Sequence, residues 1–167
     1  LCSQAVAMAM KGIPAIYFHS LCGTPNDLKG VRETGHNRTI NRKKWNLVEL
    51  DATLDDENSY SAEIFEWYSR TLIRRSSCPA FHPEAAQKIL NLGPSTFALE
   101  RKSIDSSLIV LCLFNFLPRE SRLDSMTPLR ELFFGGKARD LISGGEVEWG
   151  KGELILRPYQ ALWLSTN

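Results

Sequence analysis

The stretch GIPAIYFHSLCGTPND, residues 12–27, is the strongest indication of fold class in the sequence of this chain. It opens with a short run, residues 13–18, that is continuously apolar and rich in β-branched and aromatic residues. A run without alternation is typical of a strand that is covered on both faces, as in a parallel sheet. Pro14 lies near the start of the run, where its missing N–H costs least. We therefore predict a buried strand over residues 13–18.

The residues before this strand, 3–11, predict a helix. Ala and Met are strong helix formers, and Gly12 suits the C′ position that ends a helix. A helix that is followed by a buried strand across a tight glycine turn is the αβ half of a βαβ repeat. The chain begins at Leu1 without an initiator Met, and we expect it to be cut from a longer polypeptide.

A long polar segment, residues 19–45, follows the predicted strand. Loops longer than about 12–15 residues without regular structure are uncommon in compact domains, and they are usually functional or disordered. Leu28 and Trp45 are among the apolar residues in the segment that argue against simple disorder. In a (β/α)8 TIM barrel, the loop after each strand builds the active site. We therefore expect this segment to line a pocket.

A second helix is predicted to begin between residues 55 and 59. Its apolar positions recur every four residues, at Tyr60, Ile64, Tyr68 and Leu72. Acidic residues lie at its start and arginines toward its end, which complements the helix dipole.

From about residue 84 the pattern changes to short β-type runs separated by Gly, Pro, Ser and Asp. These runs are KILNL, TFALERKS, SLIVLCLFNF, GELILRP and QALWLS, while PLRELFFGGKARDL is ambiguous between helix and strand. The fold class is therefore α/β plus all-β. We predict the last strand, loop and helix of a (β/α)8 barrel over residues 1–78, incomplete here, and a small antiparallel β-sheet domain over residues 79–167. Trp149 and Trp163 are expected in the core of that domain rather than on an exposed platform for sugars.

Composition limits the class of protein. The chain is 43% hydrophobic and 23% charged, as soluble globular proteins are. Lys plus Arg number 20 against 19 for Asp plus Glu, which argues against a nucleic-acid or anionic-membrane partner. The four cysteines and three histidines show no spacing typical of a metal site or a disulfide scaffold. We expect reduced cysteines, a cytoplasmic location, no metal and no cofactor.

The quoted stretch, followed by ETGHNRTINRKKW at residues 33–45, resembles the last barrel strand and loop of sucrose phosphorylase-like enzymes of glycoside hydrolase family 13, the α-amylase superfamily. EIFEWYSRTLIRRSSCPAFHPEAAQKIL, residues 63–90, resembles their last barrel helix and the entry to their C-terminal β domain. Within this group, the PAFHP segment is similar to glucosylglycerate phosphorylases.

The resemblance implies a retaining phosphorylase, which cleaves an α-glucoside with inorganic phosphate and gives α-glucose 1-phosphate. This chemistry needs a carboxylate nucleophile, a carboxylic acid/base and a stabilising third carboxylate. In the family these follow barrel strands four, five and seven, so we expect no catalytic residue and no activity in this chain alone. A family 13 hydrolase or transglucosidase remains an alternative, as does a non-catalytic β binding module.

The resemblance also implies substrate-binding residues in the long segment. Arg42 of the INR motif matches an arginine that pairs with a carboxylate deep in the glucose subsite, and Arg38 is the alternative if the loop register is shifted. Asn26 and Asp27 are expected to shape the loop, with direct sugar contact as the alternative. His19 ends the predicted strand, where it would either contact the ligand or lie in the surrounding core.

Overall fold

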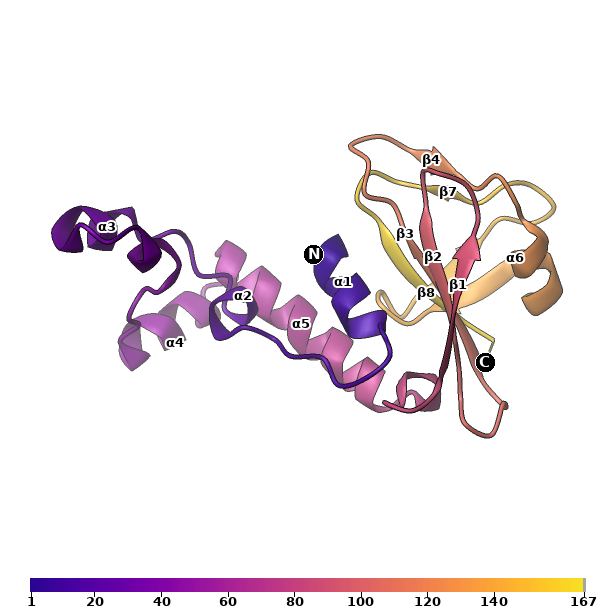
Figure 1. Ribbon diagram of the computed structural model, residues 1–167, viewed down its shortest axis with the longest axis horizontal. Coiled ribbons are helices and arrows are strands. Elements are labelled where there is room, and N and C mark those ends of the chain that lie inside the picture. The colour runs from indigo at the N-terminus through magenta and orange to yellow at the C-terminus, as the bar shows by residue number, and fades with distance from the viewer. Residues whose placement is uncertain (167) are drawn as a thin grey trace. The chain divides into compact units, whose positions relative to one another are not determined.

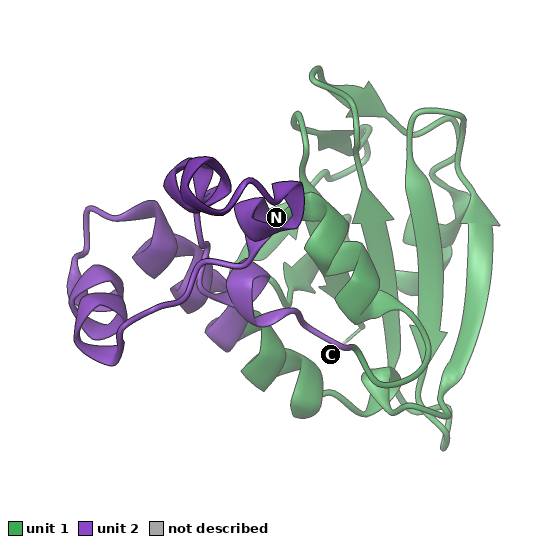
Figure 2. Ribbon diagram, turned by 60° about the vertical axis from the view of Figure 1, so that its left-hand side comes forward, with its two compact units in different colours: residues 1–14, 71–167 green, residues 15–70 purple. Residues whose placement is uncertain are grey.

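The computed structural model describes residues 1–166, and the chain divides into two compact units. Unit 1 comprises Leu1–Pro14 and the chain from Thr71 onward, and unit 2 comprises Ala15–Arg70 (Figure 2). The sequence predicted a domain boundary between residues 78 and 79, which stays a prediction. No helix of the described residues is long and apolar enough to cross a membrane.

Unit 1 is built on a six-stranded sheet whose order is β1-β2-β3-β8-β5-β6 (Figure 1). All of its strand pairs are antiparallel, which confirms the predicted antiparallel β domain. The strands are β1 (Ala86–Asn91), β2 (Phe97–Lys102), β3 (Ile109–Phe114), β5 (Lys137–Asp140), β6 (Glu146–Glu148) and β8 (Ala161–Ser165). A two-stranded sheet pairs β4 (Ser121–Arg122) with β7 (Ile155–Leu156).

The core of unit 1 lies against the middle of the large sheet. Five of the six residues of β3 are buried, as its unbroken apolar sequence predicts. Trp163 is completely buried and Trp149 is 9% exposed, so the prediction that both are core residues is confirmed. The ambiguous stretch after residue 127 proves to be a helix, α6 (Thr127–Leu132), that is followed by strand β5.

Helix α1 (Cys2–Ala9) packs on strands β3 and β8 within unit 1. The predicted helix is confirmed, but its end differs from the prediction. The helix ends at Ala9 with Met10 as its C-cap, so Gly12 lies beyond the C′ position. Gly12 has a φ of +106°, a conformation that glycine adopts without strain, and it turns the chain after the helix.

Helix α5 (Tyr60–Ser76) confirms the second predicted helix, and its residues belong to both units. Tyr68 is buried, whereas Tyr60 at the start of the helix is 84% exposed. A short 3-10 turn, η2 (Pro79–Phe81), follows and leads into β1.

The buried strand predicted over residues 13–18 is wrong for this structure. Residues 13–17 form neither helix nor strand, helix α2 (Phe18–Leu21) begins at the sixth position of the run, and Ile13 is 84% exposed. A strand needs hydrogen-bond partners along its edges, and within the described residues no strand pairs with this run. The barrel that would supply such neighbours stays a proposal.

The polar segment after the run is more regular than the sequence predicted. It contains α3 (Leu28–Thr34) and a 3-10 helix, η1 (Asn37–Asn41), and α4 (Leu47–Asp55) follows. Asp27 and Asn46 cap the two α-helices through side-chain oxygens that accept hydrogen bonds from the backbone N–H groups of Gly30 and Val48.

Candidate functional site

Two adjoining surface hollows in unit 2 share Arg38 and Arg42. The first encloses about 480 Å³ and is lined by Tyr17, Asn37, Arg38, Ile40, Asn41 and Arg42. The second encloses about 620 Å³ and is lined by Thr34, Gly35, His36, Asn37, Arg38, Thr39, Arg42 and Lys44. The structure therefore places the two candidate arginines together, in the lining of both hollows.

The 3-10 helix η1 is what brings these arginines to one place. Arg38 lies within it, and Arg42 is its C-cap residue, with a backbone N–H that donates to the Thr39 carbonyl at 3.0 Å. The Tyr17 hydroxyl donates to the Asn41 carbonyl at 3.0 Å. This bond ties the end of the apolar run to the INR motif.

Both guanidinium groups are exposed. Among the described residues, neither Arg38 nor Arg42 makes an ion pair or a side-chain hydrogen bond. The neighbouring Lys43 is different, because its Nζ lies 2.6 Å from Glu49 Oε1 and 3.5 Å from the centroid of the Trp45 ring. Lys43 is therefore anchored by its neighbours, whereas the side chains of Arg38 and Arg42 are exposed.

Asp27 acts on the shape of the loop. Its Oδ1 accepts the Gly30 N–H at 2.7 Å, and its own N–H donates to the Ile40 carbonyl at 2.7 Å, so it joins the start of α3 to η1. A Cβ on Gly30 would lie 2.2 Å from Asp27 Oδ2, which leaves no room for a side chain there. Asn26 is exposed, and its carbonyl accepts the Leu28 N–H at 3.1 Å.

His19 belongs to a separate polar cluster. Its Nδ1 lies 3.1 Å from Thr24 Oγ1, and the Trp45 indole N–H donates to the same oxygen at 2.9 Å. This cluster joins the two ends of the polar segment. His19, Asn26 and Asp27 line neither of the two arginine hollows, so the structure groups only two of the five predicted site residues.

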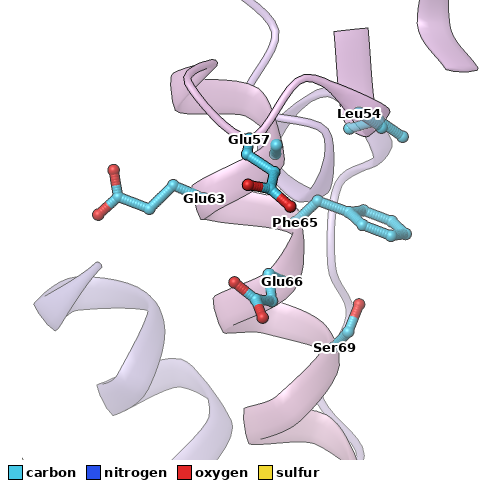
Figure 3. Close-up of a pocket in the computed structure, with 7 residues that line it drawn as sticks. Leu54, Glu57, Glu63, Phe65, Glu66 and Ser69 are labelled. Atoms are coloured by element: carbon cyan, nitrogen blue, oxygen red, sulfur yellow. The ribbon is translucent and has the colours of Figure 1, made fainter. Parts of the chain in front are cut away.

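A third hollow in unit 2, of about 680 Å³, lies between α4 and α5 and was not predicted from the sequence (Figure 3). Its lining residues are Leu54, Glu57, Ala62, Glu63, Phe65, Glu66 and Ser69. The three carboxylates are exposed, and Glu66 pairs with Arg70 one helical turn away. Exposed glutamates of this kind are typical of a solvated helix face. Within residues 1–166, no group of three or more His, Cys, Asp or Glu could hold a metal ion.

One known protein family matches the β domain of this chain. Residues 94–165 match the family described as amylosucrase, C-terminal domain. Three similar curated proteins are named glucosylglycerate phosphorylase. That of Allomeiothermus silvanus is 35% identical over 98% of this chain, that of Spirochaeta thermophila 35% over 99%, and that of Escherichia coli K12 33% over 97%. The chain spans between 26% and 29% of the length of these relatives.

Solved structures share the fold at much lower identity. An α-amylase from Anoxybacillus superposes with a TM-score of 0.66 at 16% identity, covering 98% of this chain and 31% of that one. AmyP in complex with maltose gives a TM-score of 0.66 at 13% identity, covering 99% and 34% of the two chains. At this identity the likeness shows the fold alone.

Proposed function

We propose that this chain forms the C-terminal part of a retaining glucosyl-transferring phosphorylase of glycoside hydrolase family 13, because it is similar to three proteins named glucosylglycerate phosphorylase. One observation carries the proposal. The likeness to these relatives extends over essentially the whole chain, and includes residues 37–42 of unit 2, the arginine loop, as well as the β domain. The substrates are then inorganic phosphate and a small α-glucoside. We favour glucosylglycerate over sucrose as that α-glucoside.

In the proposed reaction, the bond between the glucosyl carbon and glycerate breaks and a bond from that carbon to a phosphate oxygen forms. Two inversions through a covalent glucosyl intermediate retain the α configuration. The carboxylates for these steps come from another part of the enzyme. We place the enzyme in the cytoplasm, as the cysteine usage of the sequence indicates.

Arg42 is the residue of this chain to which we assign substrate binding. A guanidinium is planar and permanently charged, so it can hold a carboxylate and a sugar hydroxyl in fixed geometry. Its position at the end of η1, in the lining of both hollows and without an ion pair among the described residues, supports this role. Tyr17 and Asp27 hold the loop through their bonds to Asn41 and Ile40.

A hydrolase or transglucosidase is the second candidate. Such an enzyme would use the same arginine loop with water or a sugar as acceptor, and the fold that this chain shares with α-amylases is compatible with it. A free-standing β binding module has less support, because the likeness to the phosphorylases includes residues far outside the β domain.

The proposal is tested in the complete enzyme, meaning the polypeptide that joins this chain to the catalytic carboxylates. Arg42→Ala leaves a desolvated carboxylate in the glucose subsite unpaired, at a cost of about 3–5 kcal/mol. We therefore expect kcat/KM for phosphorolysis of glucosylglycerate to fall by roughly two to three and a half decades. Arg42→Lys recovers little of it, because an ammonium cannot make a two-pronged contact.

Arg32→Ala is the matched control, since Arg32 is an exposed arginine of the same segment and lines neither hollow. It should stay within a few-fold of the parent, as should Arg38→Ala. A loss confined to Arg38→Ala would shift the register of the subsite to Arg38. If neither Arg42→Ala nor Arg38→Ala lost activity, this loop would be excluded as a wall of the pocket.

A further inference from the structure

Unit 1 carries a hollow of its own, about 470 Å³ in volume, beside helix α6. It is lined by Arg130, Phe133, Phe134, Gly135, Gly136, Trp149, Gly150 and Lys151. Small-molecule sites in proteins typically enclose about 300–1,000 Å³, so this hollow has the size for a ligand of about one sugar ring. Every lining residue belongs to the β domain, in a different unit from Arg38 and Arg42.

Aromatic side chains give the hollow an apolar wall. Phe133 and Trp149 are largely buried and pack edge to face, with ring centroids 5.9 Å apart. The ring of Phe134, the next residue, is 90% exposed. A fully exposed phenylalanine beside a packed aromatic pair presents an apolar surface on which the flat face of a ligand can lie.

The backbone beneath these rings is fixed by a close crossing of two glycine turns. The Gly136 carbonyl accepts hydrogen bonds from the N–H groups of Trp149 at 2.7 Å and Gly150 at 2.9 Å. A Cβ at Gly136 would lie 2.0 Å from the Gly150 carbonyl oxygen, and both glycines have positive φ. These contacts fix the backbone of the two turns that form the floor of the hollow, which lowers the entropic cost of ordering this backbone on binding.

The charge in the hollow is of one sign. Arg130 and Lys151 line it, and no carboxylate does. Neither cation forms an ion pair among the described residues, whereas Arg122 and Lys137 of the same domain are paired with Glu153 and Glu146. Two unpaired cations at one small site match a dianion, and a guanidinium with an ammonium is a combination that binds phosphate.

From this combination of groups we propose that the hollow binds a sugar phosphate. Arg130 and Lys151 hold the phosphate, and the apolar face of the sugar ring lies on Phe134. The site is independent of the proposed glucose subsite, because it shares no residue with the arginine loop. A test of this site therefore does not depend on which reaction the complete enzyme catalyses.

Calorimetric titration of the full 167-residue chain with glucose 6-phosphate tests the proposal. We expect saturable binding that is stronger than that of glucose or of inorganic phosphate, because each control ligand lacks half of the recognised groups. Arg130→Ala should weaken binding about tenfold, since a hydrogen bond to a charged group contributes about 1.5 kcal/mol or more. Phe134→Ala should weaken the binding of glucose 6-phosphate but leave the binding of inorganic phosphate unchanged.

Arg157→Ala and Phe116→Ala are the matched controls for Arg130→Ala and Phe134→Ala, because each removes an exposed residue of the same type from unit 1 outside the hollow. Both should bind as the parent does. Equal binding of glucose and glucose 6-phosphate would overturn the proposal, as would tighter binding of AMP or no binding at millimolar concentration. Loss of binding in Arg42→Ala instead of Arg130→Ala would move the site to unit 2 and would also overturn it.

Discussion

Arg101 is completely buried, and its guanidinium donates to three backbone carbonyls. The acceptors are Ala9 at 2.8 Å, His82 at 3.0 Å and Ala86 at 3.3 Å, which belong to the end of α1, the turn after η2 and the start of β1. Burial lowers the pKa of this arginine from its usual range. A cation at the C-terminal end of a helix also interacts favourably with the partial negative charge of the helix dipole there. One side chain therefore joins three segments of unit 1.

Arg101→Ala should lower the free energy of unfolding by about 3 kcal/mol or more. The substitution leaves three carbonyls without their donor, and a buried unsatisfied group costs about 1–3 kcal/mol. Urea denaturation, followed through tryptophan fluorescence, measures the loss. Arg122→Ala is the control, because it breaks an exposed ion pair with Glu153 that contributes about 0–1 kcal/mol. Equal losses in the two variants would contradict this account of Arg101.

We expect the thiol of Cys112 to make the free energy of unfolding depend on pH in the alkaline range. Burial raises the pKa of its thiol well above the ordinary value of 9.0, so the folded chain keeps a proton that the unfolded chain loses. The folded state then binds more protons above pH 9, and the free energy of unfolding falls as pH rises, by up to about 1.4 kcal/mol per pH unit for one such group. Cys112→Ala should reduce this slope between pH 9 and 10 in urea denaturation. An unchanged slope would contradict the assignment.

The helices and strands that could be predicted from the sequence are those whose apolar pattern is contained in the local sequence. The runs that became β1, β2, β3 and β8 have the apolar pattern of strands that form one sheet within the chain. Residues 13–18 have the same kind of pattern but form no strand, because pairing depends on neighbours that the local sequence does not contain. Helices α3 and α4 were missed although Asp27 and Asn46 precede them, since a single Asx residue signals a turn as readily as a helix cap.

The backbone amides of helix α1 should be protected from hydrogen exchange as strongly as those of the β domain, and more strongly than those of the loop segment that follows the helix. Its buried face, formed by Cys2, Ala5, Met8 and Ala9, packs within unit 1, and Arg75 donates to the Met8 and Gly12 carbonyls at 2.7 and 2.8 Å. Amide hydrogen exchange should therefore show slow exchange in α1 and in the central strands, and fast exchange across residues 15–45. Equal protection of α1 and residues 15–45 would contradict the division into these two units.

Only part of the candidate site was accessible from the sequence. The INR motif located Arg42, and the structure added that Arg38 lines the same two hollows. The roles of His19 and Thr24 in closing the loop depend on Trp45, a contact between distant residues that no local pattern encodes. The hollow beside α6 arises from segments around residues 135 and 150 that meet only in the folded sheet.

For the whole molecule, we expect this chain alone to show no phosphorylase or hydrolase activity. The proposed reaction needs carboxylates on both sides of the glucosidic bond, and removal of such a group normally costs orders of magnitude in rate. Purified chain is incubated with glucosylglycerate or sucrose, with and without phosphate, and assayed for glucose and glucose 1-phosphate. Release of either product above the background of a boiled sample would contradict the expectation.

Product analysis of the complete enzyme tests whether this chain forms part of a retaining phosphorylase. The enzyme is incubated with glucosylglycerate in phosphate buffer, and the sugar product is identified by phosphorus and proton NMR. We expect α-glucose 1-phosphate as the product, formed in the same amount as glycerate and only when phosphate is present. Free glucose formed at the same rate without phosphate, or the β anomer of glucose 1-phosphate, would contradict it.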